Sequence, residues 1–395
     1  MENATSPIST PQLPFDAGLL DALMEEAGLD VLVLTSKHNV QYMLGGYRFF
    51  MFDTMDAIGL SRYLPILVYP RGAPDKAAYI ANPNERYEQE IRDFWPATIV
   101  AKARGTTDAM ALCIDHLRGI GADRGRIGVE AGFLPADAWA LMSRELGSVP
   151  PRDCVEVMET LRMIKTPAEL ELLRSASERI ERSMLETFAS IRPGQTKGQI
   201  TETLRQREVA HGLVFEYCLI TVGGSLNRAP SAEIIQEGDI LSLDSGGNLG
   251  GYIGDICRMG ILGKPPAAEL VEALAEIEAI QQAARRPVQP GRLGADIFEA
   301  VAALVEIPRE GTLSFVAHGM GLVSHEAPRL MADGPIPYPA PHRDRPLVAG
   351  MVLSIETTWQ HPRLGFLKLE DTVAVTETGW EAFGDGHRGW NRAGA

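Results

Sequence analysis

The stretch Asp239-Ile-Leu-Ser-Leu-Asp244-Ser-Gly-Gly-Asn-Leu-Gly-Gly-Tyr-Ile-Gly-Asp255-Ile-Cys-Arg258 decides how the region around it folds. Apolar residues flank a run of Gly and Asn, which predicts a β-hairpin. With the turn centred between Leu249 and Gly250, Asp244 lies opposite Asp255, and directly opposed residues share one face of a sheet. Two opposed carboxylates repel each other. Either the register is shifted, or a cation lies between the two side chains.

A second predicted hairpin has the same feature. Glu356 and Glu370 are symmetric about Arg363, which lies in a polar loop between the apolar runs 351–355 and 367–373. Two hairpins that each present an opposed acidic pair favour a divalent metal site over coincidence.

A histidine lies between the two hairpins in sequence. His318 opens the segment His318-Gly-Met-Gly-Leu-Val-Ser-His325-Glu326-Ala-Pro328 and offers a neutral nitrogen ligand. One imidazole with four carboxylates suits two ions such as Mn²⁺, Zn²⁺, Fe²⁺ or Co²⁺, and the four negative charges balance two divalent ions. Two such ions can hold a bridging hydroxide at neutral pH and stabilise the oxyanion that forms when it attacks a carbonyl.

Strands alternate with helices through the first part of the chain, which predicts an α/β domain over residues 1–157. A second unit, residues 158–395, begins near the segment 156–165, where Thr166-Pro167 predicts the start of a long amphipathic helix. Residues 46–56 are rich in aromatic side chains, and we expect them in the core rather than in a lid or a dimer contact. Tyr217 and Trp359 either line the pocket or pack in the core.

Composition limits the class of protein. The net charge of −15 argues against binding to a nucleic-acid backbone. The four cysteines form no Cys-x-x-Cys pair, which is typical of reduced thiols in a cytoplasmic protein. The first residues lack the basic and apolar regions of a signal peptide, and no run reaches the roughly 20 apolar residues that span a bilayer. We therefore expect a cytoplasmic protein with no membrane partner.

The motifs together resemble the M24 metallopeptidase family, which includes creatinase, aminopeptidase P, prolidase and methionine aminopeptidase. The matching segments are Gly238-Asp-Ile-Leu-Ser-Leu-Asp244 with Asp255, His318-x-x-Gly321-x-x-x-His325-Glu326-x-Pro328, Gly350-Met-Val-Leu-Ser-Ile-Glu356, and Glu370-Asp371-Thr372. The resemblance implies an α/β N-terminal creatinase-like domain followed by an α+β pita-bread catalytic domain.

The same resemblance implies the roles of the ligands. Asp244 chelates one ion, Asp255 and Glu370 bridge, and His318 and Glu356 bind the other ion. Glu356 also serves as general base, and His325 has a catalytic or substrate-contact role.

Two positions depart from the pattern of the proline-specific members. Asn227 stands where they have a histidine, about seventeen residues before the first metal aspartate, and an amide cannot shuttle a proton. Lys368 stands where they have arginine; strand alternation puts it on the face of Glu370, without the bidentate fork of a guanidinium. We expect both residues, with His325, to contact the substrate.

These observations predict a hydrolase with two divalent ions, manganese first and zinc, cobalt or iron as alternatives. The expected substrate is a small molecule or short peptide with an Xaa-Pro-type amide bond, and the resemblance implies a homodimer. The alternative is a non-peptidase member of the fold, a creatinase-like hydrolase or a lyase acting on a small amide or osmolyte. A metal-free binding module is the third reading, and the intact ligand set argues against it.

Overall fold

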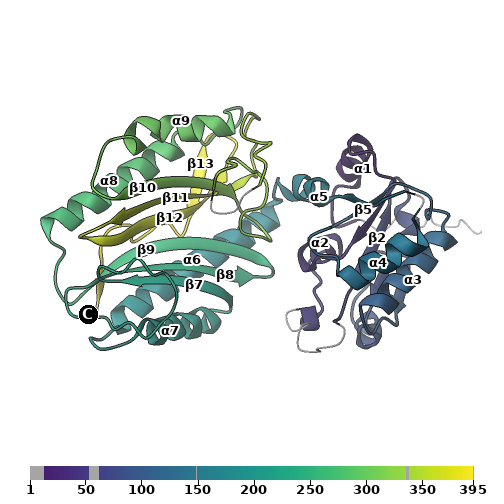
Figure 1. Ribbon diagram of the computed structural model, residues 1–395, viewed down its shortest axis with the longest axis horizontal. Coiled ribbons are helices and arrows are strands. Elements are labelled where there is room, and N and C mark those ends of the chain that lie inside the picture. Colours follow the sequence, from purple (N-terminus) through teal and green to yellow (C-terminus); the bar gives the residue numbers. More distant parts are fainter. Residues whose placement is uncertain (1–12, 53–61, 148, 335–337, 395) are drawn as a thin grey trace, which may run out of the picture. The chain divides into compact units, whose positions relative to one another are not determined.

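The computed structural model describes residues 13–52, 62–147, 149–334 and 338–394. The contacts divide the chain into two compact units, Met1–Leu161 and Arg162–Ala395 (Figure 1). The expected boundary between residues 157 and 158 lies inside helix α5 (Val155–Arg162). Val157, Met158 and Leu161 of this helix pack in a core of the first unit.

The first unit is a six-stranded mixed sheet with helices on both faces. The strand order is β4-β3-β2-β1-β5-β6. On β1, Leu32 and Leu34 pack into one apolar core with α1, α2 and α5, whereas Val31 and Val33 pack into the other with α3 and α4. The predicted α/β domain is confirmed. Its elements are α1 (Ala17–Glu26), β1 (Val31–Leu34), α2 (Lys37–Met43), β2 (Ile66–Pro70), η2 (Pro74–Lys76), β3 (Ala78–Ala81), η3 (Pro83–Glu90), β4 (Thr98–Ala101), α3 (Thr106–Gly119), β5 (Ile127–Val129), α4 (Ala136–Glu145) and β6 (Arg152–Asp153).

The aromatic segment 46–56 contributes to the core of this unit. Tyr47, Phe49 and Phe52 are buried there, and Phe50 is 72% exposed. Residues 53–56 lie outside the described part of the chain. The prediction of a core role is confirmed for the three buried rings.

The second unit is an eight-stranded sheet with its long helices in two pairs. The hydrogen-bonded path is β10-β11-β12-β9-β8-β7, with β13 on β12 and β14 on β9. Helices α6 and α7 cover the half that contains β7 and β8, and α8 and α9 cover the half that contains β10 and β11 (Figure 1). The elements are α6 (Pro167–Ser190), α7 (Lys197–Ala210), β7 (Val214–Val222), β8 (Ile240–Leu249), β9 (Tyr252–Leu262), α8 (Ala268–Arg285), α9 (Gly294–Val305), β10 (Thr312–Gly319), β11 (Val352–His361), β12 (Gly365–Val375), β13 (Trp380–Phe383) and β14 (Asn391–Ala393).

Helix α6 begins where the sequence predicts. The Thr166 side chain accepts from the backbone N–H of Glu169, the Glu169 carboxylate accepts from the N–H of Thr166, and Pro167 occupies the first turn. Ile180 and Met184 on its buried face share a core with Leu241 and Leu243 of β8. The opposite face of these strands is left for polar side chains.

The register of the β8–β9 hairpin differs from the prediction. Asp244 pairs with Cys257, and Asp255 pairs with Gly246. The turn is centred on Gly250 and Gly251, which both adopt positive φ (59° and 97°), as tight hairpin turns require. Moving the turn centre by one residue shifts the partners by two, so the two aspartates remain on one face, diagonally rather than directly opposed.

The β11–β12 hairpin has the predicted register. Glu356 pairs with Glu370, and Lys368 pairs with Thr358. Lys368 and Glu370 are two residues apart and therefore lie on one face of β12. Leu367 and Leu369, which alternate with them, are buried against α8.

The segment that follows β10 is fixed by a buried acid. The carboxylate of Glu326 pairs with the Arg162 guanidinium at 2.9 Å and with the Lys165 ammonium at 3.1 Å. A Cβ on Gly321 would lie 1.9 Å from Glu326 Oε1, so only glycine leaves room for the carboxylate. The motif glycine and motif glutamate are thus two parts of one anchor.

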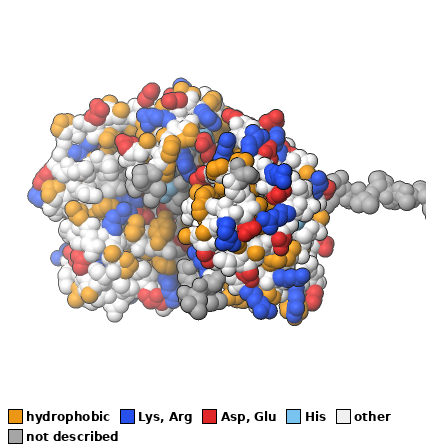
Figure 2. Space-filling view, turned by 45° about the vertical axis from the view of Figure 1, so that its right-hand side comes forward, with side chains coloured by type: hydrophobic (Ala, Val, Ile, Leu, Met, Phe, Trp, Pro, Cys, Tyr) orange, Lys and Arg blue, Asp and Glu red, His pale blue; other side chains and the backbone are white. Residues whose placement is uncertain are grey.

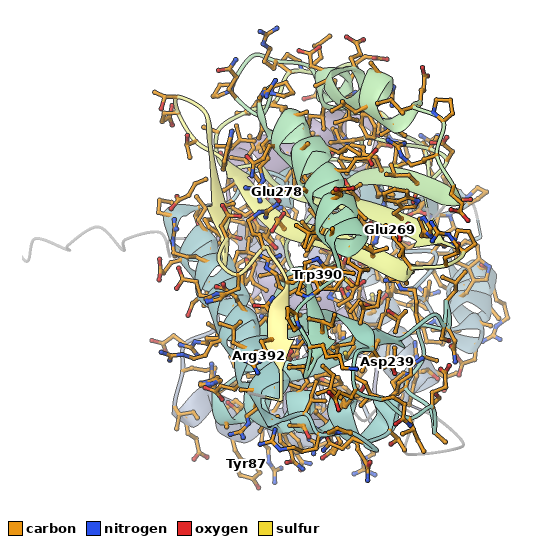
Figure 3. All side chains as sticks on the ribbon, turned by 90° about the vertical axis from the view of Figure 1, so that its left-hand side faces the viewer. Tyr87, Asp239, Glu269, Glu278, Trp390 and Arg392 are labelled. Carbon is orange, nitrogen blue, oxygen red and sulfur yellow. The ribbon has the colours of Figure 1, made fainter. Side chains whose placement is uncertain are left out.

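The C-terminal segment packs along α8. Its Trp390, labelled in Figure 3, donates from the indole N–H to the Leu270 carbonyl at 3.0 Å. Arg388 pairs with Glu278 on the same helix at 2.6 Å. Strand β14 then adds in parallel to β9, which ties the C-terminal segment to the central hairpin.

On the visible face, acidic and basic side chains are mixed (Figure 2). Among the described residues, no helix is both long and apolar enough to cross a bilayer.

We predict that Gly321→Ala destabilises the second unit. The new methyl group must displace the Glu326 carboxylate from two buried cations, and leaving a buried charge without its partner costs about 3–5 kcal/mol. Urea unfolding followed by circular dichroism measures the loss. Gly379→Ala is the matched control, because a Cβ there meets nothing within 4 Å. Equal stability of the two variants would contradict the conclusion that Gly321 leaves the room that the Glu326 carboxylate needs.

A second prediction concerns the buried Glu208 on α7. Its Oε1 accepts from the Ser245 hydroxyl at 2.8 Å, and burial raises the pKa of its carboxyl from 4.5 to about 8. The folded state therefore retains a proton that the unfolded state releases, so stability falls as pH rises from about 4.5 to 8. Glu208→Gln removes this titration, and its gain in stability over the native chain should grow between pH 5 and pH 9, to on the order of 2–4 kcal/mol.

Thermal unfolding across that pH range measures the difference. Glu299→Gln, at an exposed position on α9, is the control and should show no such trend. A gain for Glu208→Gln that is independent of pH would contradict the assignment.

Candidate metal centre

The predicted ligands converge on one pocket of the second unit. Asp244, Asp255, Glu356 and Glu370 line a cavity of about 340 Å³, and all four side chains are nearly buried. The remaining lining residues are Tyr217, Leu219, Arg228, Ser324, His325 and Lys368. His318 lies behind His325, with the two rings stacked at 3.6 Å between centroids. Side chains far apart in the sequence are therefore gathered by β8, β9, β10, β11 and β12.

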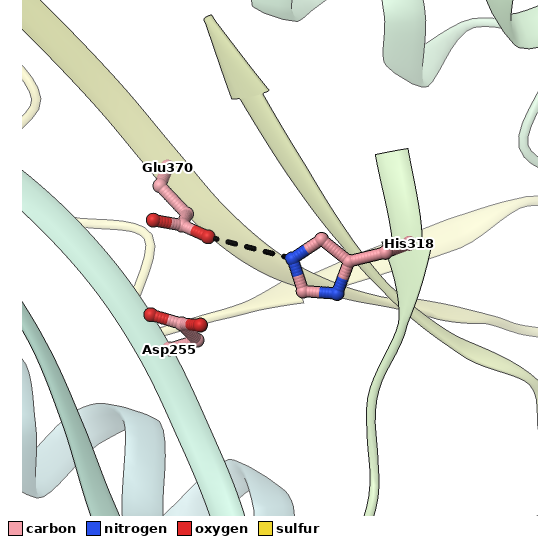
Figure 4. Close-up of side chains that lie close together, drawn as sticks. All are labelled: Asp255, His318 and Glu370. Carbon is pink, nitrogen blue, oxygen red and sulfur yellow. Dashed lines mark ion pairs between the residues drawn. The ribbon is translucent and has the colours of Figure 1, made fainter. Parts of the chain in front are cut away.

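Three of these side chains form the tightest group. One ligand atom each from Asp255, His318 and Glu370 lie within 4.8 Å of one another (Figure 4). His318 Nδ1 is 3.2 Å from the Gly319 carbonyl, which can only accept. A hydrogen bond to this carbonyl requires the proton on Nδ1, and in that tautomer Nε2, which lies 3.7 Å from Glu370 Oε1, is available to bind a cation.

A cation fits this group. Within the part of the chain that the structure describes, the buried atoms Asp255 Oδ1 and His318 Nε2 have no hydrogen-bond partner. Burial, followed by the charges of Glu370 and Asp244, raises the pKa of Asp255 well above its usual value. Converging acceptors that repel one another are the arrangement that a divalent ion relieves, and a carboxylate–imidazole set suits Mn²⁺, Zn²⁺ or Fe²⁺.

Lys368 occupies the other side of the pocket. Its Nζ is 2.7 Å from Asp244 Oδ2, 2.5 Å from Glu356 Oε2 and 2.8 Å from Glu370 Oε2. Burial alone would lower the pKa of this ammonium, but the three carboxylates raise it well above its usual value. These contacts put Lys368 on the Glu370 face of β12, as strand alternation predicts, and they are with the acidic residues themselves; a contact between Lys368 and the substrate stays a prediction.

Asp244 has a second cation beside it. Arg228 donates to Asp244 Oδ2, the same oxygen that Lys368 contacts, and its guanidinium lies over the Phe366 ring. Burial and Glu370 raise the pKa of Asp244, Lys368 and Arg228 lower it, and the result is about 6.

His325 is held in an uncommon backbone conformation at the mouth of the pocket. Its φ is +63°, which is rare for a residue with a side chain and marks a position fixed by its surroundings. Burial, and then the neighbouring His318, lowers the pKa of its ring to about 3. The ring is therefore neutral at ordinary pH and can donate one hydrogen bond.

Asn227 is exposed and does not line the pocket. Its Oδ1 accepts from the N–H of Ala229 at 3.0 Å, and its amide group donates to Glu233 at 3.3 Å. The neighbouring residue, Arg228, reaches Asp244 instead. A substrate contact by Asn227 remains a prediction.

Arg228 and Ser324 are pocket residues that sequence reasoning missed. The Ser324 hydroxyl donates to Asp255 at 3.3 Å, and its place directly before His325 was the available signal. Tyr217 lines the pocket, and its ring packs where Gly246 has no side chain, since a Cβ there would lie 2.4 Å from the ring. Trp359, the other aromatic residue, is buried in a core beside α8.

Comparison with known families agrees with this architecture. Residues 19–164 match the creatinase/prolidase N-terminal domain, and residues 171–377 match metallopeptidase family M24. All five predicted ligands lie within the second match.

Individual relatives are similar over most or part of the chain. The probable dipeptidase PepE of Mycobacterium tuberculosis is 27% identical over 374 residues, 91% of each chain. The Xaa-Pro dipeptidase of Pyrococcus furiosus is 28% identical over 57% of this chain and 64% of its own. The solved Xaa-Pro dipeptidase from Bacillus anthracis shares the fold, with a TM-score of 0.76 at 20% identity over 95% of this chain and 98% of that one. Since the match to metallopeptidase family M24 covers more than half of this chain, the chain belongs to that family, and it carries a creatinase/prolidase N-terminal domain.

Proposed function

We propose that this chain is a divalent-metal-dependent hydrolase that cleaves an Xaa-Pro-type amide bond in a short peptide. The observation that carries the proposal is the group of Asp255, His318 and Glu370, whose buried ligand atoms lie within 4.8 Å of one another. Among the described residues, Asp255 Oδ1 and His318 Nε2 have no hydrogen-bond partner. Manganese is the ion we expect first, because hard oxygen ligands with one imidazole suit it.

The pocket suits a small substrate. Its volume of about 340 Å³ lies at the lower end of the range for ligand sites, which fits a dipeptide better than a longer chain. The Arg228 side chain is 35% exposed at the pocket wall, and a guanidinium has donors to spare for the carboxylate of a peptide.

When bound to this group, a divalent ion would supply Lewis acidity toward the carbonyl and would lower the pKa of the attacking water. Glu356 lies on the pocket wall with one carboxylate oxygen toward Lys368, and we assign it the role of general base that takes the proton of that water. Its position on β11 is fixed by pairing with Glu370 on β12.

His325 is assigned the orientation of the substrate carbonyl or of the leaving amine. A neutral ring with a pKa of about 3 donates a hydrogen bond but is a weak source of protons near neutral pH. The proton of the leaving amine must then come from Glu356, after that residue has accepted it from water. Asn227, which is not among the lining residues, remains a proposed substrate contact.

A second candidate follows from Lys368. A buried ammonium bonded to three carboxylates makes this centre different from an all-carboxylate site. Such a centre would also fit a non-peptide amide or an osmolyte, cleaved by hydrolysis or elimination. We expect a homodimer for either candidate function, because of the resemblance of the N-terminal domain, and light scattering tests this expectation.

We predict that the chain loses activity toward Xaa-Pro dipeptides after chelation and regains it with Mn²⁺. Glu356→Gln should lower kcat by about 10²–10⁴, since the general base is lost while the shape of the side chain is kept. The release of proline from a panel of dipeptides measures both effects.

Glu377→Gln, at an exposed position beyond β12, is the control and should retain full activity. Activity that survives complete chelation would contradict the metal-dependent proposal. A Mn²⁺-loaded chain that cleaves no dipeptide of the panel but does convert a non-peptide amide would support the second candidate instead.

A further inference from the structure

Lys368 changes the number of metal ions that this centre needs. We infer that the centre holds one divalent ion, on Asp255, His318 and Glu370, and that the Lys368 ammonium serves in place of a second ion beside Asp244 and Glu356. The inference deepens the proposed function, because it concerns the same pocket, and it departs from the two-ion site that the sequence predicts.

The Lys368 ammonium lies among three carboxylates of the pocket. A protonated lysine has three N–H donors, and Nζ lies 2.5–2.8 Å from three carboxylate oxygens, of Asp244, Glu356 and Glu370. The contact with Asp244 Oδ2 has the geometry of a hydrogen bond, and the contacts with Glu356 and Glu370 are ion pairs. With the side chain only 4% exposed, these contacts replace hydration of the charge.

Asp244 is already paired with two side-chain cations. Its Oδ2 is shared between Lys368 and Arg228, and the tight group of ligand atoms does not include either Asp244 or Glu356. An ion bound to these two residues would have to displace a buried ammonium. Two cations of the same sign would then compete for the same oxygen atoms.

The formal charges of the side chains that line the pocket balance with a single divalent ion. The four lining carboxylates carry four negative charges, and Lys368 and Arg228 together carry two positive charges. The remaining two negative charges are balanced by one divalent ion. A second ion would leave an excess of two positive charges in a nearly buried site, which is costly without further anions.

Glu370 links the two halves of the arrangement. Its Oε1 faces His318 Nε2 at 3.7 Å and accepts from the Ser354 hydroxyl at 2.8 Å, whereas its Oε2 faces Lys368. One carboxylate therefore bridges the ion-binding group and the ammonium.

The test is the stoichiometry of Mn²⁺ bound to the full chain. Isothermal titration calorimetry and metal analysis after dialysis should give one ion per chain, and the electron paramagnetic resonance spectrum should be that of isolated Mn²⁺. Two ions per chain, or a spectrum of coupled ions, would overturn the inference. Absence of any bound Mn²⁺ would overturn it as well.

Three variants locate the ion. In the first pair, Asp255→Asn should weaken Mn²⁺ binding by more than about 100-fold, whereas Glu356→Gln should change it by less than about 10-fold, because of these two residues only Asp255 is a ligand. The third variant, Lys368→Met, removes the ammonium and should admit a second ion.

Equal loss of binding in Asp255→Asn and Glu356→Gln would contradict the inference, and so would a single ion in a folded Lys368→Met variant. If Lys368→Met does not fold, the native stoichiometry and the first pair still decide. Since binding is measured without substrate, one ion without peptidase activity would refute only the proposed function, and two ions with peptidase activity would refute only this inference.

Discussion

The neutralisation of four carboxylates in one nearly buried pocket constrains the rest of the second unit. An ionised carboxylate loses several kcal/mol of hydration when it is buried, and neighbouring carboxylates add repulsion. The chain meets this cost with side chains of its own on one side, Lys368 and Arg228 at Asp244, and leaves Asp255, His318 and Glu370 for a cation on the other. The helices behind the sheet and the hairpin registers hold these groups at the required separations.

The sequence predicts most of the fold because its signals are local. The capping residues Thr166 and Glu169 define the start of α6, and the symmetry of Glu356 and Glu370 about Arg363 gives the correct register of β11 and β12. The β8–β9 register is missed because the position of a turn within a Gly-rich run depends on which residues take positive φ, here Gly250 and Gly251. A shift of two residues leaves each side chain on the same face of the sheet. The prediction that Asp244 and Asp255 share a face is therefore confirmed.

The contacts of the site are harder to predict than its members. Strand alternation places Lys368 on the face of Glu370, but a lysine has four rotatable bonds, and its three partners depend on the whole pocket. The choice between Asn227 and Arg228 could not be made from the sequence, because they lie in an irregular segment with no period to assign a direction. The structure turns Arg228 toward Asp244 and leaves Asn227 bonded within its own loop. Departures from a family pattern are therefore best judged together with their neighbours.

The anchor of Glu326 also defines the smallest piece of this chain that can carry the pocket. Arg162 and Lys165, which neutralise Glu326, precede the segment 171–377 that matches the catalytic family. A fragment cut to the limits of that match would keep all five predicted metal ligands and lose both cations that pair with Glu326. Glu326 would then be a buried acid without a cation beside it, eight residues after His318 and next to His325. The stretch that supports the pocket is therefore longer than the one in which its predicted ligands are found, and it begins at Arg162, the last residue of α5.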